Sequence, residues 1–363
     1  LRCPVYTTAF TAAVLRSKAA GRGTEAPGPV IEVDPTSSMQ LGPFTVQWLP
    51  ITHSTPDTCA LHITTPAGSV LHTADWKLDA APVVGPAFDA GPYRAVGRSG
   101  VDAVICDSTN APSPGFTPTE AEVARGLADL IHGCSGRVVV ACFASSIARL
   151  QTVARIAGDE GRYFGLMGRS LHTMAGCARS VGLLDEAFAP INPAHLGYLP
   201  REEVLVLATG SQGEPGAALH RLAADSHPHL NLEQGDTVIF SARTIPGNEA
   251  SVERLQAAFR ARGIAVVHAD AHPGVIHASG HPCAGELDAM YRWLEAPVAV
   301  PVHGEPRHMA ANAAIARAAG VRLPLTGMTG DLFYLAPEPG IRRRAASVGR
   351  LELAPDGSLL PVG

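Results

Sequence analysis

The chain has 363 residues, of which 46% are hydrophobic, so it can bury a large core and is long enough for two domains. Its formal net charge of −5 excludes broad electrostatic attraction to nucleic acid and confines any phosphate-binding surface to a local groove. No run of 18 apolar residues occurs, so we expect no membrane-spanning segment and no membrane partner.

The first hundred residues predict one helix followed by short strands. Residues 4–20 carry a helical apolar pattern, and a link rich in Gly and Pro covers 21–30. Segments bounded by turn residues predict antiparallel strands at Val30–Val33, Phe44–Leu49 and Cys59–Thr64. A further strand begins at Gly68 and runs into the acidic residue Asp75. His53 and Asp75 therefore both fall at strand ends, where their side chains can converge.

From about residue 101, strands alternate with helices, which predicts a parallel sheet. The predicted strands are 102–106, 137–142, 162–167, 204–208, 236–241 and 263–270. The sequence Thr117-Pro118-Thr119-Glu120 is typical of a capping box with Pro at the first helical position, and it predicts a helix to about His132.

Several of these strands end in Ser, Thr or Gly just before a helix begins. Free N–H groups and the positive end of a helix suit a bound phosphate. The alternative is that Ser and Gly merely cap the helices. Because three or four such loops fall on one sheet edge, the pattern favours an anion-binding groove.

Two histidines stand at the ends of one unit near the C-terminal end of the chain. His281 precedes an amphipathic helix, and His303 follows the apolar strand 298–302, so both can project from the same rim of a sheet. Such rims are where α/β proteins build ligand and metal sites, and neutral imidazole is a common zinc ligand. His53 and Asp75 are the candidate partners of this pair.

Nine stretches occur in a family's order along nearly the whole chain: THSTPD (52–57), HTADWKLD (72–79), DSTNAPSPGFTPTE (107–120), ACFASS (141–146), GRS (168–170), ATGSQGEP (208–215), IPGNE (245–249), HASGH (277–281) and PVHGE (301–305). With these stretches the chain resembles the ribonuclease J family, in the β-CASP branch of the metallo-β-lactamase fold. The resemblance implies an α/β fold, a metallo-β-lactamase αββα sandwich that is incomplete at its N-terminus and carries an inserted β-CASP α/β domain. The implied boundaries are 1–107, 108–276 and 277–363.

The resemblance also implies roles for individual residues. His53, Asp75 and His303 match metal ligands, and Asp75 matches the catalytic carboxylate that bridges two zinc ions. His281 matches the catalytic histidine that assists proton transfer or stabilises the scissile phosphate, and its presence favours RNA over DNA as substrate. The positions that match substrate-binding residues are Ala144, Ser145, Ser146, His277, Ala278, Ser279, Gly280 and His281. Further candidates are Asp107, which begins the first β-CASP motif, and Ser170.

The implied function is a zinc-dependent ribonuclease of RNA processing and decay. Two zinc ions activate a water at neutral pH and neutralise the charge of a phosphodiester during its hydrolysis. Members of the family cut single-stranded RNA internally and degrade it 5′ to 3′ from a monophosphorylated end. By the same analogy we expect a cytoplasmic protein that forms a homodimer or homotetramer.

The chain departs from the family pattern at one place that matters for catalysis. The first metal motif, H-x-H-x-D-H, does not occur in the chain, which holds only three of the expected ligands. We therefore expect an N-terminally truncated product that is inactive or impaired by itself.

The alternative is a non-catalytic RNA-binding paralogue that works as the partner subunit of an active ribonuclease. The intact Asp75 favours the enzyme, because a protein freed from catalysis has no physical reason to keep a bridging carboxylate. A hydrolase of small esters or lactams is disfavoured, since it would not need the insertion at 108–276.

Overall fold

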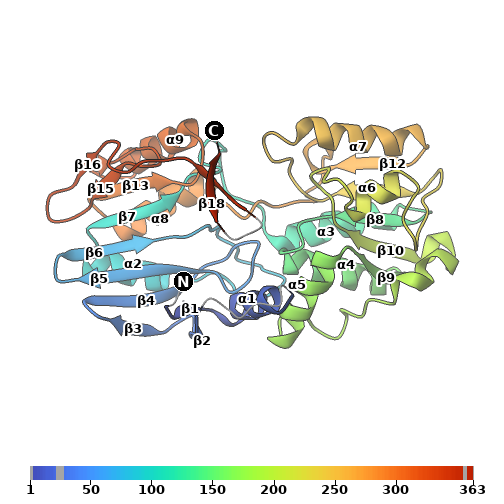
Figure 1. Cartoon of the computed structure of the whole chain (residues 1–363), viewed down its shortest axis with the longest axis horizontal. Helices are drawn as coiled ribbons and strands as arrows, with labels where there is room; N and C mark the ends of the chain where they lie inside the picture. Colours follow the sequence, from blue (N-terminus) through green and yellow to red (C-terminus); the bar gives the residue numbers. More distant parts are fainter. Residues whose placement is uncertain (1–2, 22–27, 355–357, 363) are drawn as a thin grey trace.

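The computed structural model describes residues 3–21, 28–354 and 358–362, so most of the predicted link at 21–30 lies outside the described residues. Two sheets stand side by side, each with its own helices (Figure 1). One sheet has seven strands and the other has five. The predicted α/β class is confirmed.

The seven-stranded sheet is mixed. Its order is β14 (Leu323–Pro324), β13 (Val298–Val302), β7 (Ala103–Asp107), β6 (Gly68–His72), β5 (Cys59–Thr65), β4 (Phe44–Pro50) and β3 (Ser38–Leu41). β3 to β6 are antiparallel, whereas β6, β7, β13 and β14 run parallel. β7 and β13 are direct neighbours, although the whole five-stranded sheet lies between them in the sequence.

Side chains alternate between the two faces of this sheet with the period of two expected for a strand. In β7, Val104 and Cys106 join a core covered by α2 (Gly91–Ser99), α8 (Ala284–Leu294) and α9 (Pro306–Ala318). Ala103 and Ile105 face the other way, toward the hairpin of β15 (Leu332–Tyr334) and β16 (Gly340–Arg342). The sheet is therefore buried on both faces at its centre.

The five-stranded sheet is entirely parallel, as predicted. Its order is β12 (Ala265–His268), β11 (Thr237–Phe240), β8 (Val138–Ala141), β10 (Val204–Ala208) and β9 (Tyr163–Met167). One face packs against α3 (Glu120–His132), α4 (Ile147–Asp159) and α5 (Arg169–Ser180), and the other against α6 (Ala218–Ala223) and α7 (Glu249–Ala261). Burial on both faces explains why these strands read as continuous apolar runs.

The N-terminal segment differs from the prediction in two respects. Its helix, α1, covers Ala9–Gly21, and the residues before it form β1 (Val5–Thr7) instead of a first helical turn. β2 (Val30–Glu32) pairs in parallel with β1, so the predicted antiparallel pairing of 30–33 is wrong. The physical reason is that Val33 packs under Val46 and Trp48, across a face of the large sheet and not along its edge.

Two further boundaries correct the prediction. β6 ends at His72, because Ala74 adopts a left-handed φ of 57° and turns the chain before Asp75. The capping box of α3 uses Thr119 and Glu122, not Thr117 and Glu120. Thr117 is unable to cap the helix because its amide and hydroxyl bind the buried Glu286.

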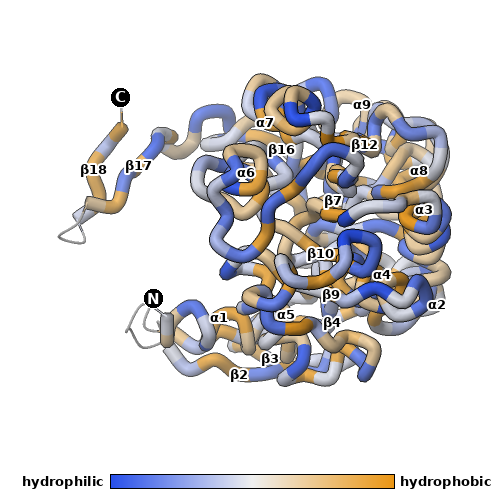
Figure 2. The backbone as a smooth tube through the Cα atoms, turned by 90° about the vertical axis from the view of Figure 1, so that its right-hand side faces the viewer, coloured by the Kyte–Doolittle hydropathy of each residue, from blue (hydrophilic) through white to orange (hydrophobic). Residues whose placement is uncertain are grey.

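α1 links the two halves, since it packs on α5 and buries Phe10 in the core beside the five-stranded sheet. The remaining short helices are η1 (Pro193–Tyr198), η2 (Arg201–Glu203) and η3 (Ala269–Ala271). The C-terminal hairpin of β17 (Arg350–Leu353) and β18 (Leu359–Val362) stands away from the rest of the chain (Figure 2). None of the described helices is long and apolar enough to cross a membrane.

Candidate active site

Pairing of β7 with β13 brings Asp107 and His303 to the same sheet edge. Asp107 lies opposite Val302 in the register, and His303 follows directly. The chain turns at His303 with a φ of 55°, and its carbonyl accepts a hydrogen bond from the Ser108 amide at 3.3 Å. The His303 ring is thereby held at the C-terminal end of the strand, half exposed to solvent.

The loops that carry His53 and Asp75 are joined to each other. Thr52 and Lys77 exchange hydrogen bonds, from the Lys77 amide to the Thr52 carbonyl at 2.8 Å and from the Thr52 hydroxyl to the Lys77 carbonyl at 2.7 Å. Each loop therefore fixes the other at the end of its strand. Asp75 Oδ2 lies 3.6 Å from Nε2 of His303.

His281 stands between the other two histidines. Its ring centroid lies 5.5 Å from that of His53 and 5.3 Å from that of His303. The close approach to His53 requires the neighbouring glycine, because a Cβ atom at Gly280 would lie 2.6 Å from Nε2 of His53. The structure thus brings His53, Asp75, His281 and His303 together, while their roles stay predictions.

The donor atoms of these side chains fit a metal ion. Those of His53, Asp75 and His281 all lie within 4.8 Å of one another, and so do those of Asp107, His281 and His303. Imidazole nitrogen and carboxylate oxygen are common donors to zinc. Burial, and then the charge of His281, lower the pKa of His53 to about 4, so its ring is neutral at pH 7.

Asp107 and His281 form a hydrogen-bonded pair. Nδ1 of His281 lies 2.7 Å from Oδ2 of Asp107, whose side chain is almost fully buried. Burial by itself lowers the pKa of His281, but the hydrogen bond and charge of Asp107, with a contribution from Asp75, raise it above its ordinary value. Asp107 therefore favours a protonated His281.

The 277–281 loop is anchored by residues that the sequence did not single out as functional. Asn110 Nδ2 donates to the Ser279 hydroxyl at 2.8 Å and to the His281 carbonyl at 3.1 Å. The Thr117 hydroxyl oxygen, whose proton goes to Glu286, lies 2.9 Å from the same carbonyl. Ala278 is buried. The available signal for Asn110 was its place directly after a predicted strand.

Burial, and then the charges of Arg149 and Arg243, lower the pKa of His277 to about 3. Its Nδ1 atom is buried and has no hydrogen-bond partner among the described residues. The His277 ring is therefore neutral at pH 7, and its Nδ1 atom is free to form a hydrogen bond with a ligand.

The Ala144–Ser146 segment connects β8 to α4. Ser146 is the N-cap residue of α4, but its hydroxyl makes no capping hydrogen bond. Within the described ranges, neither this hydroxyl nor that of Ser145 has a hydrogen-bond partner. The capping alternative therefore does not account for these two serines, and both hydroxyls are available to a ligand. Ser170 lies apart from this group, exposed at the start of α5 after β9.

A buried network of charges, which sequence reasoning missed, supports both loops of the site. Lys77 Nζ lies 3.0 Å from Asp79 and 3.5 Å from Glu120, and Arg149 lies 3.2 Å from Glu120. Arg149 also donates to the Ser241 carbonyl at 3.1 Å. The network therefore joins the loop that carries Asp75 to the end of β11.

From the end of β11 the connection continues to the 277–281 loop. The Ser241 hydroxyl donates to the Ile276 carbonyl at 2.6 Å, one residue before His277. Part of the buried charge network could have been found in the sequence, because the stretch HTADWKLD contains Lys77 and Asp79.

Two protein families match parts of the chain. One, described as "Ribonuclease J, beta-CASP domain", matches residues 135–258 and so covers the five-stranded sheet up to α7. The other, described as "Zn-dependent metallo-hydrolase RNA specificity domain", matches residues 274–323 and contains both His281 and His303.

Curated relatives match over most of the chain. Ribonuclease J of Sinorhizobium meliloti is 38% identical over 360 residues, which are 99% of this chain and 63% of that protein. Ribonuclease J of Mycolicibacterium smegmatis is 40% identical over 322 residues, 88% of this chain and 56% of that protein. Ribonuclease J2 of Bacillus subtilis is 33% identical over 363 residues, 99% of this chain and 63% of that protein. The chain thus spans less than two thirds of the length of these relatives.

A solved structure supports the fold alone. The crystal structure of a protein of unknown function from Enterococcus faecalis V583 superposes with a TM-score of 0.62 at 16% identity, covering 90% of this chain and 74% of that one.

Proposed function

The chain belongs to the ribonuclease J family, and on that premise we propose that it is the catalytic part of a zinc-dependent ribonuclease. Its substrate is single-stranded RNA, cut internally and degraded 5′ to 3′ from a monophosphorylated end. The observation that carries this proposal is the gathering of His53, Asp75, His281 and His303 around one point, with Asp107 behind His281.

His53, Asp75 and His303 would hold the zinc. The Asp75 carboxylate is close to donor atoms of both histidines, so these three side chains could bind metal together. Nδ1 of His53 accepts a hydrogen bond from the Thr55 amide at 3.1 Å, so Nε2 is the ring nitrogen that would be left for a metal ion. Bound zinc would supply positive charge for the phosphodiester and a water that is acidic at neutral pH.

His281 would donate a proton to the leaving oxygen or stabilise the scissile phosphate. A carboxylate accepts hydrogen bonds only, so the Nδ1 that faces Asp107 carries a proton and Nε2 is the atom left for the substrate. Asp107 raises the pKa of His281, which favours the ring that carries a second proton at Nε2 for donation.

The free hydroxyls of Ser145 and Ser146 would bind substrate phosphate just before α4, which begins at Ile147. The anchored loop from His277 to His281 would form the facing wall. From family resemblance alone, we further propose a cytoplasmic protein that forms a homodimer or homotetramer.

The test measures cleavage of a 5′-monophosphorylated single-stranded RNA by the protein expressed in its own cells. We expect cleavage that a chelator abolishes and added Zn²⁺ restores, and we expect Asp75→Asn to lower the rate by orders of magnitude. RNA binding without cleavage in the wild-type protein would instead support the non-catalytic RNA-binding paralogue.

A further inference from the structure

A cavity of about 720 Å³ lies in the five-stranded half, apart from the candidate active site. It opens where β9 and β10 end, and the residues that begin α5 and α6 line it. Its polar lining consists of Arg169, Ser170, His172, Thr209, Arg221, His227 and His229.

The charge of this cavity is positive and uncompensated. None of its lining residues is acidic. Within residues 3–21, 28–354 and 358–362, the side chains of Arg169 and Arg221 form no ion pair and no hydrogen bond. Burial, and then the charges of His229 and Arg221, lower the pKa of His227. Arg221 is therefore close enough to affect a ring in the cavity wall.

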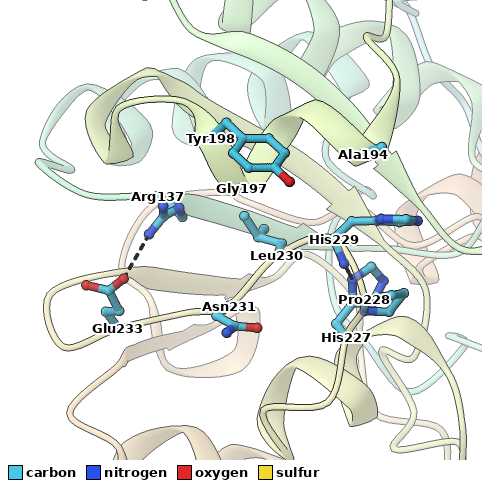
Figure 3. A pocket seen from close by; sticks show the side chains of 10 residues that line it. All are labelled: Arg137, Ala194, Gly197, Tyr198, His227, Pro228, His229, Leu230, Asn231 and Glu233. Atoms are coloured by element: carbon cyan, nitrogen blue, oxygen red, sulfur yellow. Dashed lines mark hydrogen bonds and ion pairs between the residues drawn. The ribbon is translucent and has the colours of Figure 1, made fainter.

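A neighbouring pocket provides the contrast. It has a volume of about 420 Å³ and shares His227 and His229 with the first cavity (Figure 3). Its arginine, Arg137, is turned toward Glu233, with an N–O distance of 3.6 Å, and also lies 3.8 Å from Asp236. Its positive charge is thus neutralised inside the protein, whereas the charges of Arg169 and Arg221 remain available to a ligand.

At the turn between β9 and α5, which lines the cavity, the backbone passes very close to Thr209. Gly168 has a φ of 128°, and a Cβ atom there would lie 2.3 Å from the Thr209 hydroxyl oxygen. Only glycine therefore lets the end of β9 pass Thr209 and begin α5 at Arg169. The first amides of this 12-residue helix then stand beside the Arg169 and Ser170 side chains.

The cavity also lies on the same sheet edge as the candidate active site. All five strands are parallel, so the ends of β8, β10 and β9 follow one another along that edge. β8 leads to Ser145 and Ser146, and β9 lies two strands away, roughly 10 Å at the usual strand spacing. A strand of nucleic acid that occupies the active site can therefore reach the cavity.

We propose that this cavity binds a backbone phosphate of the RNA strand, beyond the nucleotides held at the candidate active site. Arg169 and Arg221 supply the charge, and Ser170 with the α5 amides supplies hydrogen bonds. The inference rests on the proposed function, because it assumes that the ligand of the neighbouring site is RNA.

The experiment measures equilibrium binding of two fluorescent single-stranded RNAs, one of about 12 nucleotides and one of about 4, over a range of salt concentrations. Arg169→Gln and Arg221→Gln should each weaken binding of the longer RNA and lower its log–log salt slope by about 0.7. Both side chains are exposed, so the thermal midpoint should not change. Binding of the short RNA should be the same in all proteins.

Arg260→Gln, an exposed arginine of α7 that donates to Gln256, is the matched control and should have no effect on either RNA. If the wild type binds no RNA, the proposed function fails. If it binds RNA and the two variants behave like Arg260→Gln, only the present inference fails. Finally, calorimetry measures whether the protein binds AMP, a free nucleotide with one phosphate. AMP binding that needs the two arginines, with unchanged affinity for RNA, would overturn the assignment in favour of a free nucleotide.

Discussion

The Nδ1 atom of His281 lies 2.7 Å from Oδ2 of Asp107, although 174 residues separate the two in the chain. The Asp107 carboxylate lies at the end of β7, at the sheet edge, and the His281 ring lies in the loop before α8. The buried carboxylate accepts a proton-bearing Nδ1, which leaves Nε2 for a ligand and raises the pKa of the ring.

In the protein expressed in its own cells, we expect His281→Ala to lower RNA cleavage about 10²- to 10⁴-fold, the usual contribution of a proton donor, and to change RNA binding far less. Cleavage is measured in single turnover and binding with the same RNA in the presence of a chelator. Zinc content should stay at the wild-type value, because His303, His53 and Asp75 are intact. An equal loss of cleavage and binding would identify a structural histidine.

Gly280→Ala tests how closely the 277–281 loop must approach the candidate metal site. The new Cβ would meet the His53 ring at 2.6 Å, so either the ring or the loop has to move. We expect lower zinc affinity and lower activity, measured by metal titration and RNA digestion.

Gly176→Ala is the control for this substitution, since nothing lies within 4 Å of a Cβ atom at that position in α5. It should leave activity unchanged and stabilise the protein by up to about 1 kcal/mol. Equal zinc affinity in both variants would contradict the assignment of His53 as a ligand.

The sequence predicted the parallel sheet and placed His53, Asp75 and His303 close to strand ends, because buried strands are continuous apolar runs ended by polar residues. It did not predict that the strand before Asp75 ends at His72. Neighbouring positions for His303 and Asp107 also follow once their strands pair in one sheet.

Other features depend on contacts between distant segments, which local patterns do not encode. Thr117 looked like a helix cap, yet it binds Glu286, 169 residues later. β1 and β2 pair because their segment covers a face of the large sheet, and hydrophobic spacing alone does not select the face. The cavity beside Ser170 likewise needs β9 and β10 to be neighbours, which their order in the chain does not state.

Glu120→Gln tests the buried charge network. Glu120 is the only carboxylate that Arg149 contacts among the described residues, so the variant leaves a buried guanidinium without its partner. We expect the free energy of unfolding to fall by about 3–5 kcal/mol, measured by urea denaturation. Asp185→Asn, which breaks the exposed pair with Arg155, should cost less than about 1 kcal/mol.

The same carboxylate predicts acid sensitivity. Burial raises the pKa of Glu120, but the charges of Arg149 and then Lys77 outweigh it and hold the pKa below its ordinary value of 4.5. A lowered folded-state pKa contributes stability that is fully present above pH 4.5 and is lost as the pH falls through the folded value. Urea midpoints of the wild type should therefore fall below pH 4.5 more steeply than those of Glu120→Gln. Parallel pH profiles would show that Glu120 is not the responsible group.

Finally, we expect the 363-residue chain by itself to bind zinc weakly and to have little nuclease activity. The proposed ligands in this chain are one carboxylate and two imidazoles, whereas two four-coordinate ions need more donors than these. Metal analysis after equilibrium dialysis and digestion of 5′-monophosphorylated RNA measure the two properties.

Asp75→Asn should remove the remaining zinc, because Asp75 is close to both histidines. Asp270→Asn, which alters an Asp–His pair outside the site, should not. Tight zinc binding with robust turnover by this chain would mean that the ligand assignment is wrong.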